Sequence, residues 1–542
     1  MARKQTTHRQ DGKHASSTTA TANRKLHKNH GAHKAAQASK SQRQNPGRLP
    51  FPDEVLHLIF PYLTWRDTYR VGGVSRLWQK AHKDSLQHAS IAWNSSLLQA
   101  DSWDDVLSRL QPTVPCFAMP MAPHLALVVV SGQSHAFRRM TGWQKLFDVI
   151  HARHLLPSSC RIVCMYSDAG IIGGPSLNSN AACELEPDTI DEGIAVCITV
   201  GHLPGTDITL LTPDKESINS TMRQVHAGRP RTECAGFGFH DNATTSCVLL
   251  STNSRQSAAL VRCLAHLYPS LAVVGGILPF TDRCMPLVFR GPSSSILENA
   301  TNLLVSFSGR VRATPFVSLG YAFACPILEC TAVTPRHHPH FGLLHMYDAV
   351  HQVGAAIDVH PLQLLHGLPT PSGTLHLFIA ATLADAHAFV ANPAAAPLPS
   401  IECSYDSQHG VLFSQSDADD PHEANNLWPV GSYGVFCTQS AEAARSDFDA
   451  SVVAAKHRIA ITHGVPVGAV MFPCAARGEA FYEAPNVESD AFDAAFPGVP
   501  LTGVFAGGEI GPMAGPGGAF RSLAPQMQQF TTCGAVFYAA GP

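Results

Sequence analysis

Three stretches of the chain share one pattern, in which an apolar run is followed by a helical segment and then by a second apolar run. They cover residues 125–174, 247–279 and 468–512. The apolar runs are short and do not alternate with polar residues, which indicates strands buried on both faces beneath helices. In the second and third copies the helical segment ends in an aromatic residue and a proline, and the next strand runs into a Gly-Gly pair. A repeated strand–helix–strand unit therefore constrains the fold more than any other feature.

The remaining apolar runs set the fold class. The 542 residues are too many for one core, and the runs at residues 302–309, 316–333 and 531–541 are typical of antiparallel strands. We expect an α+β fold, with a small all-α segment on the N-terminal side and then a two-lobed α+β domain that contains the repeated units. The two lobes are predicted at residues 124–335 and 340–542.

Three parts are predicted before the lobes. Residues 1–47 are basic and polar with almost no large apolar side chain, so they cannot offset the entropy of ordering and should form a disordered tail. An all-α segment and a following helix are placed at residues 48–95. A helical pattern over residues 85–110 then predicts a helix, and a proline-rich linker ends this part of the chain, which covers residues 96–123.

The all-α segment carries two helix start signals in quick succession. Pro52 suits the first turn of a helix. Thr64 can cap a second helix, with Asp67 three residues later reaching back to it. Apolar stripes at three- and four-residue spacing follow both signals: Val55, Leu56, Ile59, Phe60 and Leu63, then Val71, Val74, Trp78 and Ala81. Helices this short cannot bury both stripes among themselves, which leaves two interpretations: a docking surface for a partner, or a helical hairpin packed on the following domain.

Composition gives no global reason to expect nucleic acid or a membrane as a partner, because the formal net charge is −3. No apolar run approaches the length of a membrane span, and the N-terminus has no signal-peptide pattern. The 15 cysteines are scattered without CxxC pairs. In a chain with no secretory signal they indicate reduced thiols of a cytoplasmic or nuclear protein.

The stretch FPDEVLHLIFPYL followed by VGGVSRLWQKA resembles an F-box, the helical module by which substrate receptors of cullin-based ubiquitin ligases bind a Skp-family adaptor. Two departures from that pattern are Phe51, where the family usually has Leu, and Pro61, which should end or kink the first helix. The resemblance implies a set of adaptor-binding residues: Pro52, Leu56, Ile59, Phe60, Leu63, Val74 and Trp78.

The third repeated unit resembles the C-terminal half of a FIST domain. That family combines a Cys-x-x-Arg-Gly strand end, an acidic-aromatic helix and a Gly-Glu-Ile-Gly loop, which here are Cys474 to Gly478 and Gly508 to Gly511. Strands within residues 161–174 and 271–277 resemble the N-terminal half. FIST domains of bacterial sensors are thought to bind small ligands such as amino acids, so the resemblance implies a possible ligand or substrate pocket at these residues.

Four residues are candidates for that pocket: Cys474, Arg477, Gly508 and Glu509. The guanidinium of Arg477 and the carboxylate of Glu509 could hold the two charges of a zwitterion. Alternatively, the two side chains pair with each other and brace their loops. Cys474 could act as a nucleophile beside Arg477, but the sequence identifies no base for it, and a buried structural thiol is the other interpretation.

No other motif predicts a catalytic or metal site. The histidine-rich stretch from Pro335 to His345 could be read as a metal site, but it has no regularly spaced cysteine, and we interpret it as an exposed loop between the lobes. The chain has no nucleotide-binding loop, nucleophile elbow or zinc-protease motif. We therefore expect no catalytic residue, no metal and no cofactor.

The sequence thus favours a non-catalytic adaptor. The chain would be the substrate receptor of a Skp–cullin–F-box ubiquitin ligase, in which the F-box binds the Skp-family adaptor, and through it a cullin, while the FIST domain binds a target protein for degradation. The alternative is a sensing module for an amino-acid-like ligand, in which the F-box-like helices have a structural role. An enzyme that uses Cys474 is a third possibility.

Overall fold

A computed structural model describes most of the chain after residue 58. The described residues are 59, 63–74, 76, 78–80, 90–137, 140–174, 181–190, 193–234, 236–239, 244–280, 284–292, 298–323, 326–338, 342–353, 358–359, 374–391, 398, 400–406, 411–416, 428–514 and 520–540. The chain divides into two units, Met1–Phe51 and Pro52–Pro542. The first unit, with the predicted tail at residues 1–47, lies outside the described residues. In the described part of the chain no helix has both the length and the apolar character needed to cross a membrane.

The three predicted strand–helix–strand units are present, and in each the two strands are parallel neighbours. The central parts of these strands are apolar and buried, as the absence of alternation predicted. The first unit is β2 (Leu125–Gly132), α5 (Thr141–Ala152) and β3 (Arg161–Tyr166). The second is β8 (Thr244–Ser251), α8 (Ser254–Leu267) and β9 (Ala272–Ile277). The third is β22 (Val465–Pro473), α13 (Val487–Ala495) and β23 (Leu501–Val504).

Each unit belongs to a longer repeat with the same order of elements: an edge strand, a helix, the strand–helix–strand unit, a hairpin and a returning strand. The first repeat adds β1 (Ala92–Ala100), α4 (Trp103–Arg109), β4 (Ile171–Gly174), β5 (Cys183–Leu185) and β6 (Ile194–His202). The second adds β7 (Thr206–Leu211), α7 (Lys215–His226), β10 (Leu287–Arg290), β11 (Glu298–Asn299) and β12 (Asn302–Gly309). The third adds β13 (Val311–Ser318), α11 (Ala441–Ile461), β24 (Glu509–Ala514), β25 (Phe520–Gln528) and β26 (Thr532–Ala539).

The repeats exchange their hairpins in a closed cycle. Three six-stranded sheets have the orders β1-β6-β2-β3-β10-β11, β7-β12-β8-β9-β24-β25 and β13-β26-β22-β23-β4-β5. Each sheet therefore contains four strands of one repeat and the hairpin of another. The first repeat gives its hairpin to the third sheet, the third repeat to the second sheet, and the second repeat to the first sheet. No repeat completes its sheet alone, so the three are expected to fold as one cooperative unit.

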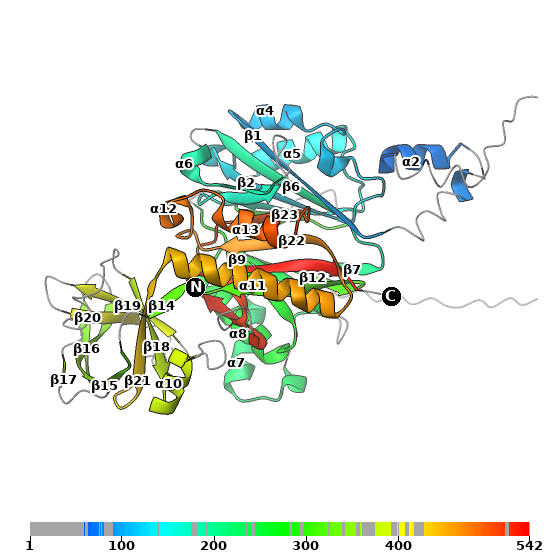
Figure 1. Cartoon of the computed structure of the whole chain (residues 1–542). Helices are drawn as coiled ribbons and strands as arrows, with labels where there is room; N and C mark the ends of the chain where they lie inside the picture. Colours follow the sequence, from blue (N-terminus) through cyan, green and yellow to red (C-terminus); the bar gives the residue numbers. More distant parts are fainter. Residues whose placement is uncertain are drawn as a thin grey trace, which may run out of the picture. The chain divides into compact units, whose positions relative to one another are not determined.

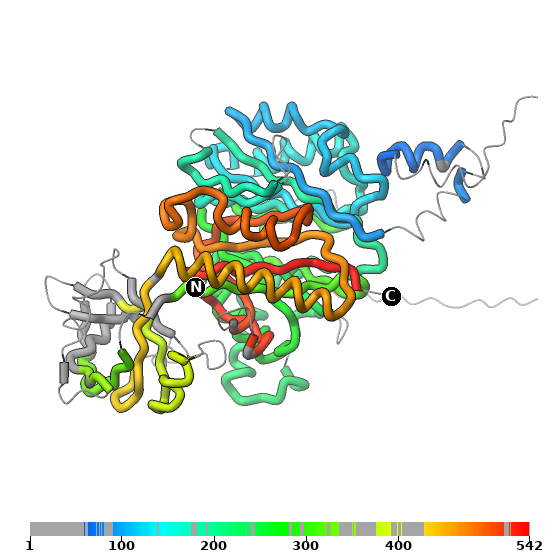
Figure 2. The backbone as a smooth tube through the Cα atoms, viewed as in Figure 1, coloured from blue at the N-terminus to red at the C-terminus, as the bar shows by residue number. Residues whose placement is uncertain are grey.

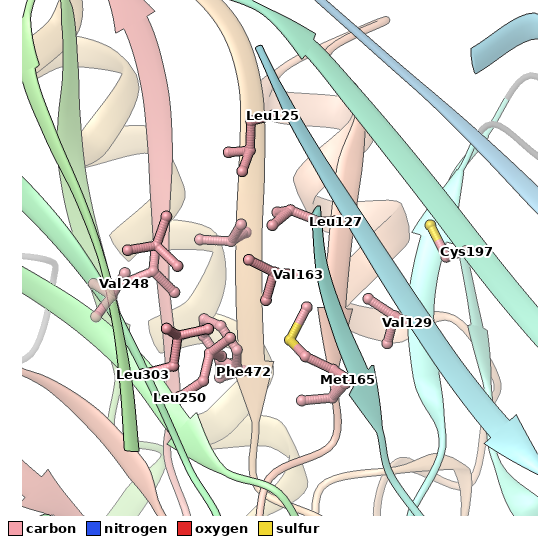
Figure 3. Close-up of a cluster of buried hydrophobic side chains, with 14 of the residues drawn as sticks. Leu125, Leu127, Val129, Val163, Met165, Cys197, Val248, Leu250, Leu303 and Phe472 are labelled. Carbon is pink, nitrogen blue, oxygen red and sulfur yellow. The ribbon is translucent and has the colours of Figure 1, made fainter. Parts of the chain in front are cut away.

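The three sheets enclose a common core. One face of each sheet contributes to a single apolar cluster, with Leu127 from the first sheet, Leu250 from the second and Phe472 from the third (Figure 3). The opposite faces are covered by helices: α4 and α5 on the first sheet, α7 and α8 on the second, and α11 and α13 on the third. Figure 2 follows the chain through the repeats, from blue to green and then from orange to red. Both faces of the central strands are thus removed from water, which is the main source of stability.

An antiparallel barrel is inserted in the third repeat, between its edge strand β13 and its first helix α11 (Figure 1). Six strands close a ring in the order β15-β16-β20-β19-β18-β21, because β21 pairs with both β18 and β15. The barrel elements are β14 (Tyr321–Phe323), β15 (Leu328–His338), β16 (Gly342–Gln352), β17 (Asp358–Val359), β18 (Thr374–Ala380), α10 (Leu383–Ala391), β19 (Ser400–Asp406), β20 (Val411–Ser416) and β21 (Tyr433–Gln439).

The structure differs from the sequence predictions at the start of the body. The helical pattern over residues 85–110 is correct for α4 and wrong for β1, where Trp93 and Leu97 face the common core and Leu98 faces the helices. This alternation is that of a strand. The predicted linker before residue 123 is also packed rather than free, since Phe117 and Met119 are buried against the first sheet.

The predicted boundary between two lobes coincides with a barrel hairpin instead. Pro335 to His338 belong to β15, where Pro335 lies opposite His345 of β16, so this stretch is not an exposed loop. Here β15 has one neighbouring strand, because its pairing with β21 is confined to Leu328 and Glu329. A proline is tolerated on the unpaired side of a strand. The sheets themselves combine strands from both sides of the predicted boundary.

Candidate functional site

The predicted pocket residues lie at one end of the third repeat. Cys474 follows β22 and forms a bridge with Ala506. Strand β24 begins three residues after Ala506, at Glu509. Gly508 has a φ of +149°, a backbone conformation that a residue with a side chain rarely adopts. The structure thus brings Cys474, Gly508 and Glu509 close together, with the charge of Arg477 near enough to act on Glu509.

Arg477 is committed to partners within the protein. Its guanidinium forms an ion pair with Glu488 at 2.7 Å, with both side chains at most 1% exposed. It also donates to the Ser318 carbonyl at 2.9 Å and to the Tyr482 hydroxyl at 2.8 Å. Burial alone would lower the pKa of Arg477, but Glu488 and Tyr482 raise it overall. Arg477 is therefore a fixed internal cation, and no N–H of it faces an open site.

The carboxylate of Glu488 completes this network. Thr532 donates to its two oxygens at 3.0 and 2.7 Å, and the Tyr482 hydroxyl donates to Oε1 at 2.6 Å. Burial raises the pKa of Tyr482, and the adjacent Glu488 raises it further. A buried ion pair is stable only when further hydrogen bonds satisfy both charges, and this one meets that condition.

Glu509 is not the ion-pair partner of Arg477. Its side chain is fully buried, and Oε2 accepts hydrogen bonds from the Thr531 amide and hydroxyl, both at 3.0 Å. Burial raises its pKa to about 8, while Thr531, the Cys474 thiol and the Arg477 charge oppose the rise. No donor among the described residues reaches Oε1 with the geometry of a hydrogen bond. An acceptor left free in the interior is costly and marks Glu509 as the unusual member of the group.

Cys474 does not have the properties of a nucleophile. Burial raises the pKa of its thiol to about 12, and the neighbouring Glu509 raises it as well. The thiol is then protonated at neutral pH, whereas nucleophilic cysteines need a lowered pKa. In the described parts of the chain no group of three or more histidine, cysteine, aspartate or glutamate side chains could hold a metal ion.

Sequence reasoning missed the residues that organise this end of the repeat. Glu488 was part of the acidic-aromatic helix and Tyr482 lies on the short helix α12 (Glu479–Tyr482) before it, but neither was singled out, although an acid in the first turn of a helix beside a buried strand was a usable signal. Glu184, on the hairpin from the first repeat, accepts from the Ser489 amide at 2.7 Å and so caps α13. Burial and then Glu488 raise the pKa of Glu184 to about 8. No sequence signal links residues that are so far apart in the chain.

The second candidate site is the helical segment before the repeats. Helix α2 spans Trp65–Gly72, and Thr64 caps it as predicted, its hydroxyl accepting from the Asp67 amide at 3.4 Å. The Asp67 carboxylate reaches back and accepts from the same hydroxyl at 2.7 Å. The helix ends at Gly72, with Gly73 as its C-cap. Pro52, Leu56 and Phe60 lie outside the described residues.

One side of α2 is held by the first repeat. Arg66 donates to the carbonyls of His154 and Leu155 at the end of α5, and the Trp65 amide donates to the Met119 carbonyl at 2.8 Å. Thr68 is buried and donates to the Thr64 carbonyl at 2.8 Å. These contacts agree with the interpretation of helices packed on the following domain.

The same segment also exposes apolar side chains to solvent. Tyr69 is 76% exposed and Val74 is 69% exposed, the two highest values among the large apolar side chains described. Ile59, Leu63 and Trp78 are half-buried. Single exposed apolar side chains are common on protein surfaces, and Val74 matters here because it belongs to the predicted set of adaptor-binding residues.

Comparison with known proteins identifies one domain. Residues 427–512 match the model of the FIST C domain. This stretch is therefore similar to a FIST C domain, and all four candidate pocket residues lie within it. The match does not reach the helical segment before the repeats, for which the F-box resemblance stays a prediction.

Two curated relatives each match 86 residues of the chain. They are uncharacterized proteins of Mycobacterium tuberculosis, from strains CDC 1551 / Oshkosh and ATCC 25618 / H37Rv. Each is 35% identical over 86 residues, which is 16% of this chain and 22% of the relative. This chain thus matches about a fifth of the length of these relatives, and their names assign no function.

Proposed function

We propose that this protein is a non-catalytic adaptor. Its helical segment docks a Skp-family adaptor of a cullin-based ubiquitin ligase in the cytoplasm or nucleus, and the body that contains the FIST C domain binds a target protein. The observation that carries the proposal is the exposure of Tyr69 and Val74 on a segment that Arg66 anchors to the first repeat. Anchoring the segment lowers the entropy lost on docking, because the exposed side chains start from a positioned backbone.

The chemistry of the FIST C domain supports a role without catalysis. The Cys474 thiol is protonated at neutral pH, and the Arg477 guanidinium is neutralised by Glu488. A group that is already satisfied inside the protein contributes little to a reaction at the surface. In the proposed complex the covalent chemistry takes place on the partner enzymes, and this chain supplies binding surfaces.

Binding of a purified Skp-family adaptor to the full-length chain tests the proposal. We expect Val74→Asp to weaken binding at least tenfold, because a charge placed in an apolar interface is left unpaired. The matched control is Val453→Asp on α11, where the valine is 58% exposed. This control should bind like the wild type. Equal affinity of Val74→Asp and the wild type, or a wild type that binds no adaptor, would contradict the proposal.

A second function has one specific observation in its favour. The free oxygen of Glu509 could accept a hydrogen bond from the ammonium group of a small ligand, as the sensing alternative requires. Arg477 is engaged with Glu488 and cannot hold the carboxylate of a zwitterion. The candidate ligand is therefore a small amine, with amino acids as one class of it.

Thermal unfolding with amines, amino acids and carboxylic acids tests this second function. A ligand that binds the folded state raises the melting temperature by mass action. Amines and amino acids should raise it, simple carboxylic acids should not, and Glu509→Gln should abolish the rise. Because the pKa of Glu509 is about 8, the effect should be larger at a pH above 8 than at pH 6.5. A rise that persists in Glu509→Gln would place the ligand elsewhere.

A further inference from the structure

A cavity of about 290 Å³ lies between the second and third sheets, away from both candidate sites described above. Edge strand β13 and its neighbour β26 form its lining from the third sheet, together with Arg458 of α11. The starts of β8 and β9, with β25, line it from the second sheet. The cavity thus draws on two repeats that exchange a hairpin, and its lining is built into the fold rather than added by a surface loop.

Two side chains on β13 face this cavity together. Arg312 and Thr314 are two residues apart on a strand, so they project from the same face. Arg312 lies directly opposite Tyr538 of β26, which also lines the cavity. Neither Arg312 nor Thr314 makes a side-chain hydrogen bond or an ion pair with another residue in the described part of the chain, so both polar groups are available to a ligand.

Arg458 supplies a second, rigidly held guanidinium. It donates to the Pro315 carbonyl at 2.8 Å, and its guanidinium carbon lies 4.5 Å from the centre of the Phe520 ring. Both contacts fix a side chain that would otherwise be flexible, and a guanidinium placed in advance loses less entropy on binding. Burial lowers the pKa of Arg458 to about 10, which still leaves it cationic at neutral pH.

The lining has cations but no carboxylate. Arg312 and Arg458 line one space of about 290 Å³, and no aspartate or glutamate is among the described residues that line it. Guanidinium groups bind carboxylate and phosphate with matched geometry, so a space lined by two of them suits an anion. The hydroxyls of Ser270 and Thr314 add donors for further oxygens.

We propose that this cavity is a binding site for a small organic oxyanion, a carboxylate or a phosphate. The charged group lies between Arg312 and Arg458, and the apolar part of the ligand packs on Phe520 and Leu523. The volume is at the lower end of the range for small-molecule sites, so the ligand has about one ring or a short chain. The site is independent of the adaptor function proposed above.

Calorimetric titration of the full-length chain at constant ionic strength tests the site. The probes are inorganic phosphate, benzoate and benzamide, the last being the neutral analogue of benzoate. Arg312→Gln should weaken binding of the anionic probe at least tenfold, because one charge-assisted hydrogen bond is lost. Its matched control is Arg310→Gln, an exposed arginine two residues away that does not line the cavity. Thr314→Val is a second variant and should weaken binding by a smaller factor without changing the charge.

Each outcome has a definite meaning. Binding of phosphate in preference to benzoate assigns the site to phosphates, and the reverse assigns it to carboxylates with an apolar part; either supports the proposal when only Arg312→Gln and Thr314→Val weaken it. Benzamide binding as tightly as benzoate would overturn it. So would an equal loss in Arg310→Gln and Arg312→Gln, which would show a general field of positive charge. Absence of binding for both anions at about 10 mM would also overturn it.

Discussion

The first and third repeats share a topology but differ in what they bury at the same place. The hairpin strand begins with Ile171 in the first repeat, Leu287 in the second and Glu509 in the third, and all three side chains are fully buried. The first repeat therefore fills this position with an apolar side chain, as a sheet core requires. The third fills it with an acid, next to the buried ion pair of Arg477 and Glu488.

This difference separates what the fold needs from what it does not need. Two repeats show that the exchanged hairpin packs well with an apolar side chain at this position, and burying a charge there without full compensation is destabilising. The polar end of the third repeat is therefore not a requirement of the topology. The buried acid Glu509 lowers the stability of this end of the third repeat. Functional sites are often found at such destabilising positions.

The largest expected effect comes from breaking the buried ion pair. Arg477→Ala should lower the free energy of unfolding by about 3–5 kcal/mol, because Glu488 is then left charged and unpaired in the interior. Urea unfolding followed by circular dichroism measures it. The double variant Arg477→Met, Glu488→Leu should recover most of the loss, since two apolar groups leave no charge stranded. If the double variant were no more stable than the single one, the third repeat would depend on charge for its fold.

A core truncation tests whether the sheets are equivalent. Leu127→Ala in the first sheet and Leu250→Ala in the second should each cost about 2–5 kcal/mol, because both leave a cavity in the same apolar cluster. The unfolding transition should stay single in both variants, as expected for repeats that share strands. Two separate transitions in either variant would show that the repeats unfold independently.

The hairpin exchange itself predicts a smaller effect. Glu184→Ala should cost about 1–2 kcal/mol, because α13 of the third repeat loses the acceptor at its N-terminus. Amide hydrogen exchange should increase first in the first turn of α13, even though the substitution is in another repeat. An increase confined to the hairpin that carries Glu184 would contradict this coupling.

The raised pKa of Glu509 predicts a pH dependence of known sign. The ordinary pKa is 4.5 and the folded value is about 8, so between these values the folded state binds more protons than the unfolded one. Stability from this group therefore falls as pH rises from about 4.5 to about 8, by at most about 1.4 kcal/mol per pH unit. Glu509→Gln removes the dependence, so its stability relative to the wild type should increase over this range. A relative stability that does not vary with pH would mean that Glu509 is ionised in the folded state.

The sequence was informative where one repeat determines its own structure. Unbroken apolar runs such as Leu125–Gly132 predicted buried strands, and Thr64 with Asp67 predicted the start of α2. Both signals are local. The partner of a hairpin strand is not local, so nothing in the residues around Ile171 indicates that it pairs with Val504 of the third repeat. The two predicted lobes failed as a description of the sheets for that reason, and because the barrel inserts within a repeat.

Three of the four candidate pocket residues lie close together. Cys474 follows β22, Gly508 precedes β24 and Glu509 is the first residue of β24. The bridge between Cys474 and Ala506 brings the three residues together. Arg477 and Glu509 each lie beside a glycine near the end of a strand. The sequence therefore allowed them to pair with each other as the alternative to binding a ligand. The structure instead pairs Arg477 with Glu488, whose position on a helix turned toward the strands could not be read from spacing.

Hydrogen exchange of the full-length chain, with and without a purified Skp-family adaptor, tests the central claim most directly. The account predicts that slowed exchange on binding is concentrated in the helical segment around Trp65–Gly72 and Val74, with the three sheets unchanged. Slowed exchange in the barrel or at the FIST C domain, with none in the helical segment, would contradict the claim that this segment is the docking surface.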